Sequence, residues 1–263
     1  DADDPIPLAE CLQNFALNET RLGRMREARA ALERALALIK LPKEPAPRVR
    51  ALNALASICV NLSNTVRALD GPAAALPYND RAVEAIESAL TIRPEDVILR
   101  FNRYNAHGAR AQTLESLGRY DDARRDIEVL VAGSDNRQRP INLIWLTLNS
   151  LQLRRYDDAE NEYDALRVAQ ATDLDLIYNA SCLQARFVKV LRADDRIVPD
   201  QRLRLIAEHT ATALECLSRV ARAGMFDNEN DARLLVNDED LDPIRDEPEL
   251  QELVRRYAKK LKK

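Results

Sequence analysis

The sequence predicts an all-α fold, and three observations support this prediction. Only 6 of the 263 residues are Gly and 5% are aromatic, whereas 46% are hydrophobic and 31% are charged. The chain is rich in Ala, Leu, Arg and Glu, which lose little on entering a helix. Apolar residues recur every three or four positions, and most of the 12 prolines stand between such segments, where they separate helices.

The apolar spacing and the prolines predict helices along the whole chain. In one segment, Leu52, Leu55, Ala56 and Cys59 fall on a single helical face. In the first half we expect helices at 8–21, 24–40, 48–69, 77–92, 96–117 and 120–132. In the second half we expect them at 140–153, 156–170, 174–192, 200–223, 229–236 and 247–261. Pro77 is expected to begin the fourth helix, because proline favours the first turn.

Three turns share one residue pattern, in which a helix ends at Gly or Arg and the next helix begins with a large side chain, followed by Ala. These segments are LGRMREARAALERAL (22–36), LGRYDDARRDIEVL (117–130) and LRRYDDAENEYDAL (153–166). The shared alanines are Ala28, Ala123 and Ala159. A small residue there lets the paired helix approach closely, while the large residues fill the space between the helices.

This pattern resembles the tetratricopeptide repeat (TPR), a helix-turn-helix unit of 34 residues. The resemblance implies a single solenoid domain over 1–263, a right-handed superhelix of antiparallel helix pairs. We expect about five irregular repeats, at 8–41, 48–95, 96–135, 140–172 and 174–225, with a C-terminal cap at 226–263. The spacing between equivalent alanines is uneven, so we expect lengthened helices or protruding loops at 68–78 and before Pro199.

The last third contains a second set of motifs. LIYNASCLQARF (176–187) is followed by DEDLDPIRDEPELQEL (238–253). These strings resemble the C-terminal repeats of large bacterial serine/threonine protein kinases, in which a TPR array follows a kinase domain. Because the chain begins at Asp1 rather than Met, we expect a processed protein or a segment of a longer polypeptide. In the cap, Leu241, Ile244, Leu250 and Leu253 are expected to be buried.

The sequence offers no enzyme motif. The kinase motifs H-R-D, D-F-G and A-P-E are missing, and so are the Gly-rich loops that cradle nucleotides. We therefore expect a non-enzymatic chain without a cofactor. His107 and His209 lack a neighbouring nucleophile and are expected to be packing or surface residues.

Metal and redox chemistry is also disfavoured. Residues 227, 229, 231 and 238 mimic ligand positions of a calcium loop, but Ala232 stands where the turn glycine is needed, so we expect no metal. Cys11, Cys59, Cys182 and Cys216 are far apart, and each lies in an apolar stripe. We expect them to pack as free thiols, which fits a reducing, cytoplasmic compartment.

The charge balance favours protein partners. With 39 basic and 43 acidic side chains the net charge is −4, so no overall positive field attracts nucleic acid or anionic membranes. No apolar stretch reaches the roughly 20 residues that a membrane span needs. An RNA-reading helical repeat is a weaker alternative, because no repeated pair of base-reading side chains is present.

The TPR resemblance implies that the first helix of each pair lines a concave groove that binds a peptide or a helix. The candidate groove residues are Asn14, Thr20, Asn53, Ser57, Asn61, Asn105, Gly108, Gln112, Trp145 and Gln152. Amide side chains suit this role because they both donate and accept hydrogen bonds. Trp145 either anchors a partner or packs between repeats, and Gly108 permits close approach by a partner or a neighbouring helix.

One known TPR activity is disfavoured. The dicarboxylate clamp that holds chaperone C-termini requires Lys and Asn where Gln13 and Leu17 stand. The leading hypothesis is therefore a protein-interaction module of a bacterial signalling protein of the serine/threonine kinase type. The alternative is a structural, oligomerising or autoinhibitory scaffold that packs on itself or on its own kinase domain.

Overall fold

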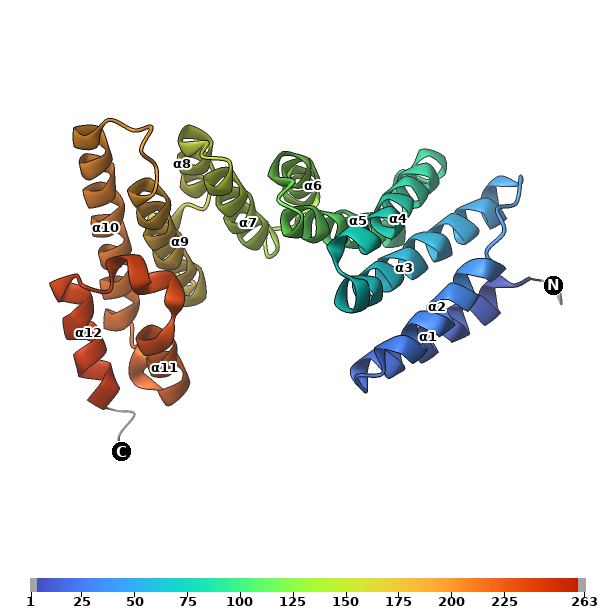
Figure 1. Ribbon diagram of the computed structural model, residues 1–263, viewed down its shortest axis with the longest axis horizontal. Coiled ribbons are helices and arrows are strands. Elements are labelled where there is room, and N and C mark those ends of the chain that lie inside the picture. The colour runs from blue at the N-terminus through green and yellow to red at the C-terminus, as the bar shows by residue number, and fades with distance from the viewer. Residues whose placement is uncertain (1–3, 260–263) are drawn as a thin grey trace. The chain divides into compact units, whose positions relative to one another are not determined.

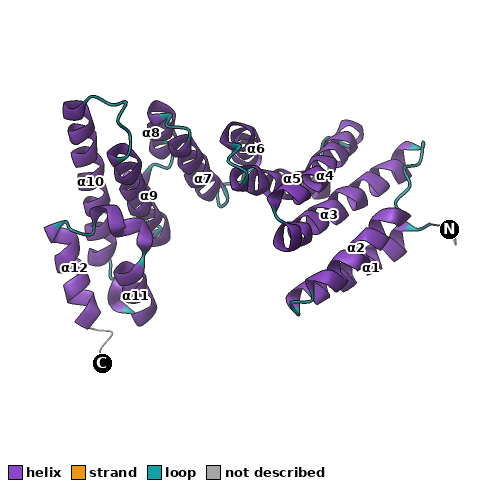
Figure 2. Ribbon diagram, viewed as in Figure 1, coloured by secondary structure: helices purple, strands orange, loops and turns teal. Residues whose placement is uncertain are grey.

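The computed structural model describes residues 4–259, and within this range every regular element is a helix (Figure 2). The first six helices are α1 (Ile6–Arg21), α2 (Met25–Leu38), α3 (Pro45–Asp70), α4 (Pro72–Ile92), α5 (Val97–Ser116) and α6 (Tyr120–Gly133). The next are α7 (Arg139–Gln152), α8 (Tyr156–Asp164), α9 (Leu174–Arg192), α10 (Pro199–Arg222), α11 (Glu229–Asn237) and α12 (Pro248–Ala258). Three short 3₁₀ helices are η1 (Val168–Gln170), η2 (Met225–Asp227) and η3 (Glu239–Ile244). The prediction of an all-α chain is confirmed.

Two predicted helix ends are wrong. Helix α4 begins at Pro72, directly after Gly71, so Pro77 lies inside the helix instead of starting it. Pro77 is the sixth residue of the helix, so it removes the hydrogen bond to the Ala73 carbonyl, while its ring is exposed. Helix α8 ends at Asp164, well before residue 170, because Arg167 takes a left-handed conformation. Residues 260 and 261 of the predicted last helix lie outside the described residues.

Backbone contacts divide the chain into two compact units, 1–135 and 136–263, which we call unit 1 and unit 2. Unit 1 contains the helix pairs α1/α2, α3/α4 and α5/α6, and its first helices are neighbours, α1 beside α3 and α3 beside α5 (Figure 1). Unit 2 contains the pairs α7/α8 and α9/α10, followed by the C-terminal segment. The prediction of one solenoid domain stays a prediction.

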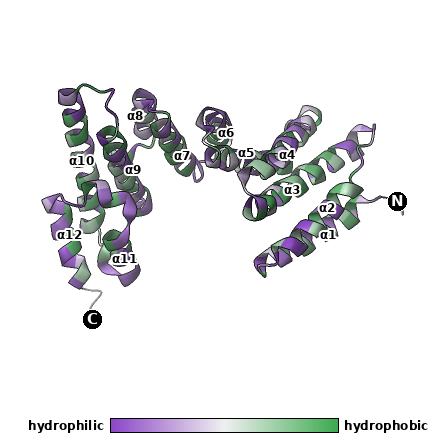
Figure 3. Cartoon of the chain, viewed as in Figure 1, coloured by the Kyte–Doolittle hydropathy of each residue, from purple (hydrophilic) through white to green (hydrophobic). Residues whose placement is uncertain are grey.

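The repeated alanines, and Ala82 at the matching place in α4, lie in the core, as the residue pattern predicts. Ala28, Ala82, Ala123 and Ala159 are fully buried, each near the start or in the middle of a second helix. Coloured by hydropathy, the helices show apolar stripes alternating with polar ones (Figure 3). The buried stripes form the core between paired helices, so each pair is held by the burial of apolar side chains.

The three shared turns have the same hydrogen-bonding geometry. The N–H of Arg24, Arg119 and Arg155 donates to the carbonyl five residues earlier, at distances of 2.8, 2.9 and 2.9 Å. This hydrogen bond ends a helix when the residue before the donor has a left-handed backbone conformation, with positive φ. Gly23 and Gly118 supply φ values of 76° and 71°, and Arg154 adopts φ 56° at the same place. The third repeat therefore keeps the turn without its glycine.

The motifs of the last third hold the C-terminal segment onto α9. The Tyr178 hydroxyl donates to Asp238 at 2.8 Å, and Arg192 donates to the carbonyl of Pro243 at 2.6 Å. The buried side chains Leu241, Ile244 and Leu250 confirm the predicted apolar contacts, while Leu253 is half-buried. Several residues that resemble kinase-associated repeats thus have a packing role here.

The cysteine prediction is partly wrong. Cys59, Cys182 and Cys216 are buried free thiols, but Cys11 is exposed. Burial raises the pKa of Cys59 to about 11, so this thiol is held in its neutral form. Cys11 belongs to an apolar stripe that is not covered by another helix within residues 4–259, which the sequence pattern alone did not reveal.

Candidate functional site

The candidate site in unit 1 is the exposed side of α1, α3 and α5, which we call the first-helix face. Its helices are the first members of three consecutive pairs, and they lie next to one another. Six predicted groove residues occupy exposed or half-buried positions on α3 and α5: Asn53, Ser57, Asn61, Asn105, Gly108 and Gln112. Their common placement gives the face its polar character.

Polar side chains link neighbouring first helices across this face. Gln13 of α1 donates to the Ser57 hydroxyl of α3 at 2.6 Å. Between α3 and α5, Asn102 donates to the Asn53 side-chain oxygen at 2.7 Å. Further along the same pair, Arg67 donates to the Gln112 side-chain oxygen at 3.2 Å. These three bonds, which we call the rungs, fix the relative axial positions of the helices.

The rungs use only part of the hydrogen-bonding capacity of these residues. Asn53 and Gln112 each accept one bond through the oxygen, and each amide also carries an NH₂ group with two donors. Asn102 and Gln13 act as donors in their rungs and still have their amide oxygens. The face therefore combines a rigid polar framework with groups that can bind a backbone.

The remaining predicted residues of unit 1 differ in their surroundings. Asn14 is exposed on α1, whereas the Thr20 hydroxyl donates to the Ala16 carbonyl of its own helix at 3.0 Å. A Cβ atom on Gly108 would meet only Leu130 of α6, at an ordinary 3.9 Å. The neighbouring helix therefore does not require glycine at position 108.

The start of α5 adds apolar side chains that we did not predict as site residues. Val97, Ile98 and Phe101 are 77%, 65% and 59% exposed, while Leu99 in the same run is buried. Phe101 lies four residues before Asn105, so these two side chains lie on the same side of α5. The signal in the sequence is the segment VILRF (97–101) after Asp96, in which only Arg100 is polar, so it is too apolar for a helix with one buried face.

Asp96 fixes where this apolar run begins. Its side chain accepts hydrogen bonds from the N–H groups of Ile98 and Leu99 at 2.9 and 3.2 Å, which caps α5. The cap sets the helix start, and the packing of Leu99 and Ala106 in the core sets which side of α5 faces outward. Ile98 and Phe101 are held outward by the same geometry that buries Leu99.

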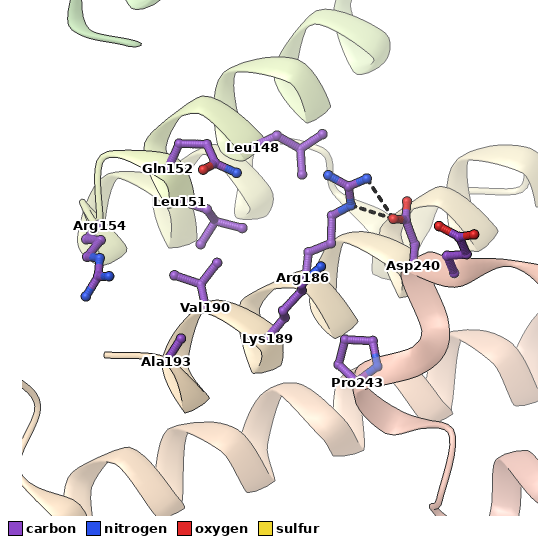
Figure 4. Close-up of a pocket in the computed structure, with 11 residues that line it drawn as sticks. Leu148, Leu151, Gln152, Arg154, Arg186, Lys189, Val190, Ala193, Asp240 and Pro243 are labelled. Carbon is purple, nitrogen blue, oxygen red and sulfur yellow. Dashed lines mark hydrogen bonds and ion pairs between the residues drawn. The ribbon is translucent and has the colours of Figure 1, made fainter. Parts of the chain in front are cut away.

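In unit 2 the two predicted site residues lie on α7. Trp145 is half-buried, so it combines packing with partial access. Gln152 is exposed and lines a cavity of about 460 Å³. Figure 4 shows the cavity between α7, α9 and η3, with Leu151 of α7 facing Val190 of α9. Gln152 is a predicted groove residue, whereas the residues of α9 and η3 that line the cavity were not predicted.

The wall of this cavity carries paired and unpaired charges. Arg186 contacts Asp240 through two nitrogens, at 2.8 and 2.7 Å, as the dashed lines in Figure 4 mark. Lys189 forms no ion pair with any of residues 4–259. The floor is apolar, with Leu148, Leu151 and Pro243. A cavity with an apolar floor and a few charges can hold a side chain of a partner.

A buried carboxylate stabilises the edge of this region. Asp194 is fully buried and accepts hydrogen bonds from Arg196, Tyr156 and Arg154 at 2.7 to 2.9 Å. The bonds from Arg196 hold the pKa of Asp194 well below its usual range. Burial, together with the bond to Asp194, raises the pKa of Tyr156 to about 12. Tyr156 is the large residue of the repeat pattern, and its hydroxyl ties α8 to the end of α9.

A second buried network lies in unit 1. His107 Nδ1 is 2.6 Å from Asp126, and its Nε2 is 2.9 Å from Glu87. Arg110 adds two bonds to Asp126, at 2.8 and 2.7 Å. Burial opposes ionisation of Asp126, but the bonds from Arg110 and His107 outweigh it and lower the pKa. The network joins α4, α5 and α6, so His107 is a packing residue.

His209 is buried in unit 2, where its closest polar partner is an uncharged amide. It stacks on Phe187 with a ring separation of 4.3 Å, and its Nδ1 is 2.6 Å from the Gln184 side-chain oxygen. Burial lowers the pKa of His209 to about 4. Both histidines thus fit the predicted structural roles.

No cluster of three His, Cys, Asp or Glu side chains within residues 4–259 is arranged to hold a metal ion. None of the described helices combines the length and the apolar character required to cross a lipid bilayer.

The sequence matches no known family model, and it matches no curated protein. Among solved structures it is similar to a putative kinesin light chain from Podosopora anserina that consists of nearly identical TPR-like repeats. The TM-score is 0.54 at 16% identity, over 80% of this chain and 97% of that chain. A single-residue variant of that protein gives 0.53 at 17% identity, over 81% and 98%. By its fold, the chain is an all-α array of TPR-like helical repeats.

Proposed function

We propose that this chain is a non-catalytic interaction module that binds a peptide or protein segment along the first-helix face of unit 1. The observation that carries the proposal is the combination of exposed Ile98 and Phe101 with the neighbouring amide rungs. An apolar anchor supplies affinity through burial, and nearby amides satisfy the backbone of an extended segment. The TPR-like fold is consistent with a binding role.

The cavity of unit 2 is a second contact region for a protein partner. Its apolar floor suits an aliphatic or aromatic side chain, and Lys189 offers a charge at the edge. Gln152 lines the same cavity and provides an amide. Binding here is proposed as part of the same protein-recognition function.

The first-helix face can be tested by selection from a phage-displayed random peptide library on the whole chain. Affinities of selected peptides are then measured by fluorescence anisotropy for wild type and for Phe101→Ala. We expect affinity to fall by about tenfold or more, because an aromatic anchor at an interface contributes about 2 kcal/mol. The control is Leu203→Ala on α10, where the leucine is 65% exposed and lies in the other unit.

Peptides that bind Phe101→Ala as tightly as wild type would exclude the apolar end of the face as the binding site. Asn61→Ala tests the polar part in the same assay, since Asn61 is half-buried and lies away from the three rungs. If Phe101→Ala lowers the peptide affinity and Asn61→Ala does not, the binding site is restricted to the start of α5. Circular dichroism of each variant checks that the fold is intact.

We also propose a cellular context, a bacterial signalling protein of the serine/threonine kinase type with a cytoplasmic repeat region. The sequence motifs of the last third and the free thiols support it. The interaction module would then recruit substrates to the kinase or regulate it. A coding sequence for a kinase domain upstream of Asp1 would support this context, and an unrelated domain there would contradict it.

A structural or autoinhibitory scaffold is the second candidate function. The specific observation in its favour is the exposed apolar side of α1, which carries Leu8 and Phe15. This side could contact another copy of the chain or an attached domain.

A further inference from the structure

Another cavity of unit 2 lies between α8, α9 and α10. Its volume is about 340 Å³, and none of its lining residues lines the cavity beside η3. Three carboxylates and three rings form much of its wall: Glu160, Asp164, Glu208, Tyr163, Phe187 and His209. No Lys or Arg side chain lines it. We call this space the acidic cavity, and its volume is at the small end of ligand sites, which span about 300–1,000 Å³.

Helix spacing places the carboxylates around one space. Glu160 and Asp164 are four residues apart on α8, so they share one side of that helix, while Glu208 comes from α10. No three His, Cys, Asp or Glu side chains within residues 4–259 are arranged to hold a metal ion. The acceptors of the acidic cavity therefore match a larger cation that carries several hydrogen-bond donors.

The carboxylates are poorly neutralised by the chain itself. Within residues 4–259, neither Glu160 nor Asp164 forms an ion pair with an Arg or Lys side chain. Arg204 Nε lies 4.0 Å from Glu208 Oε1, and both of these side chains are more than half exposed. Burial raises the pKa of Glu160, and the nearby carboxylates of Asp157 and Asp164 raise it further. The cavity thus has a negative potential that favours a cation.

His209 adds an unused acceptor to the wall. Its Nδ1 is 2.6 Å from the Gln184 side-chain oxygen, and the NH₂ group of that amide bonds to the Tyr163 hydroxyl. Because the amide oxygen can only accept, Nδ1 carries the hydrogen of the neutral ring and Nε2 keeps a lone pair.

The lone pair of Nε2 has no donor within residues 4–259. Glu160 Oε1, 3.8 Å away, is itself an acceptor. His209 is 9% exposed and lines the acidic cavity beside Glu160, so a donor has to enter the cavity to reach Nε2. The buried nitrogen and the carboxylates therefore point to the same kind of ligand, a cation that donates hydrogen bonds.

The rings of the wall favour a guanidinium group over an ammonium group. His209 stacks on Phe187 with ring centroids 4.3 Å apart, and Tyr163 lies between Glu160 and Asp164 on α8. A guanidinium group is planar, carries five N–H donors and stacks on rings, whereas an ammonium group is a compact charge with three donors. Acceptors on two helices with rings beside them match the planar group better.

We propose that the acidic cavity binds an arginine side chain of a protein partner. The guanidinium group donates to Glu160 and Glu208 and reaches Nε2 of His209. The cavity accommodates one long side chain, so the rest of the partner stays outside. This site belongs to unit 2 and the first-helix face belongs to unit 1, so the two binding proposals are tested independently.

The primary test is a titration of the whole chain with N-acetyl-arginine amide, which has one guanidinium group and no other charge. Two-dimensional ¹H–¹⁵N NMR follows the backbone signals of Asp164, Gln184 and Thr212, which line the cavity. We expect saturable shifts at these residues. The dissociation constant should rise by about fivefold or more in Glu160→Gln and in Glu208→Gln, because each loses one charged contact.

Glu252→Gln on α12 is the matched control, since it removes the same charge from an exposed side chain of the same unit outside the cavity. It should leave the dissociation constant unchanged. A loss of affinity in Glu252→Gln as large as in Glu160→Gln would overturn the site. Absence of saturable shifts at the cavity residues would overturn it as well.

Matched probes test the chemistry of the ligand. N-acetyl-citrulline amide has the shape of the arginine probe without its charge, and we expect no binding. N-acetyl-lysine amide should bind more weakly than the arginine probe, and equal or tighter binding would overturn the assignment to arginine. A blocked peptide with one Arg between alanines should bind at least as tightly as the single residue. Weaker binding of this peptide would exclude a protein partner.

The role of His209 has its own spectroscopic test. Long-range ¹H–¹⁵N NMR of the imidazole rings reports which nitrogen carries hydrogen. We expect a protonated Nδ1 and an unprotonated Nε2 in the free chain, with the Nε2 signal moving as the arginine probe binds. A protonated Nε2 in the free chain, or an Nε2 signal that the probe does not move, would contradict its role as an acceptor.

Discussion

His107 shows how one side chain can connect three helices. It lies on α5 between Asp126 of α6 and Glu87 of α4, and its two ring nitrogens contact both carboxylates. Replacement by Ala would remove both contacts and leave the buried Asp126 with Arg110 as its remaining charged partner. The side chain is therefore a stability determinant of unit 1.

We expect His107→Ala to lower the free energy of unfolding by about 2 kcal/mol, since it removes a side chain that contacts two carboxylates, one of them the buried Asp126. The measurement is urea denaturation followed by far-UV circular dichroism. Arg100→Ala on the same helix is the control, because its ion pair with Glu95 is exposed and should contribute about 0.5 kcal/mol or less. Similar losses for both variants would refute the assigned role of the buried network.

His209 makes stability depend on pH in a defined direction. Burial lowers its pKa from 6.5 to about 4, so the unfolded chain binds a proton more readily than the folded chain. Stability contributed by the neutral side chain is complete above pH 6.5 and falls as the pH drops towards 4. Below pH 4, His209 causes no further change in the free energy of unfolding, because it is protonated in both the folded and the unfolded chain.

We expect the difference in unfolding free energy between wild type and His209→Asn to shrink by about 1–3 kcal/mol over this pH range. Denaturant titrations at several pH values measure it. The comparison removes the titration of carboxylates that both proteins share. A difference that is constant with pH would show that His209 does not titrate as assigned.

At the scale of elements, the repeat turns depend on left-handed residues. Gly118 has φ 71° after α5, whereas Gly133 ends α6 without a positive φ, and a Cβ atom at either residue would meet open space. The two positions thus differ in backbone conformation and not in crowding. They form a matched pair for substitution.

We expect Gly118→Ala to destabilise the chain by about 1 kcal/mol, because a Cβ atom disfavours the left-handed conformation. Gly133→Ala should be neutral or stabilising by up to about 1 kcal/mol, since Ala loses less entropy in a helix. Thermal and urea denaturation of both variants give the comparison. Equal effects would indicate that the turn does not require positive φ.

Much of the fold could be predicted from the sequence because each repeat encodes a local pair of helices. Ala123 and Ala159 fall at equivalent places, and the close contacts that they permit need no distant information. The start of α4 was missed because Pro77 favours a helix start only on average. Cys11 was missed because helical spacing shows which residues share a side, but not whether a neighbour covers it.

The candidate site was less accessible to sequence reasoning. Asn53 and Gln112 were predicted to face a groove, but the rungs that they form depend on the axial positions of neighbouring helices. Those positions follow from hairpin lengths that vary along the chain. Ile98 and Phe101 were missed because an apolar run suggests a core, and the packing of Leu99 in the core determines which of its residues point outward.

At the scale of the whole molecule, the contacts concentrate within unit 1 and within unit 2. Helical repeat arrays gain stability mainly from contacts between adjacent repeats, so a group of complete pairs can fold by itself. Unit 2 contains two complete pairs and a C-terminal segment whose Leu241 and Ile244 are buried.

We expect the isolated fragment 136–263 to be helical and to unfold cooperatively. Circular dichroism during thermal unfolding tests this, with the fragment 1–135 measured in parallel. A fragment that ends after α9 is the control, since it loses α10 and should unfold at a lower temperature. A non-cooperative fragment 136–263 would show that the unit depends on the rest of the chain.

The rungs also explain which changes in length the repeats can accept. They join residues 44, 49 and 45 positions apart, so the number of residues between partners is not constant. An insertion in the loop between a first and a second helix leaves the axial position of each rung residue along α3 or α5 unchanged. An insertion of one residue within α3, between Asn53 and Arg67, would turn the later half by about 100° and separate Arg67 from Gln112. Natural variation in length is therefore expected in the loops, while the first helices keep a constant length between rungs.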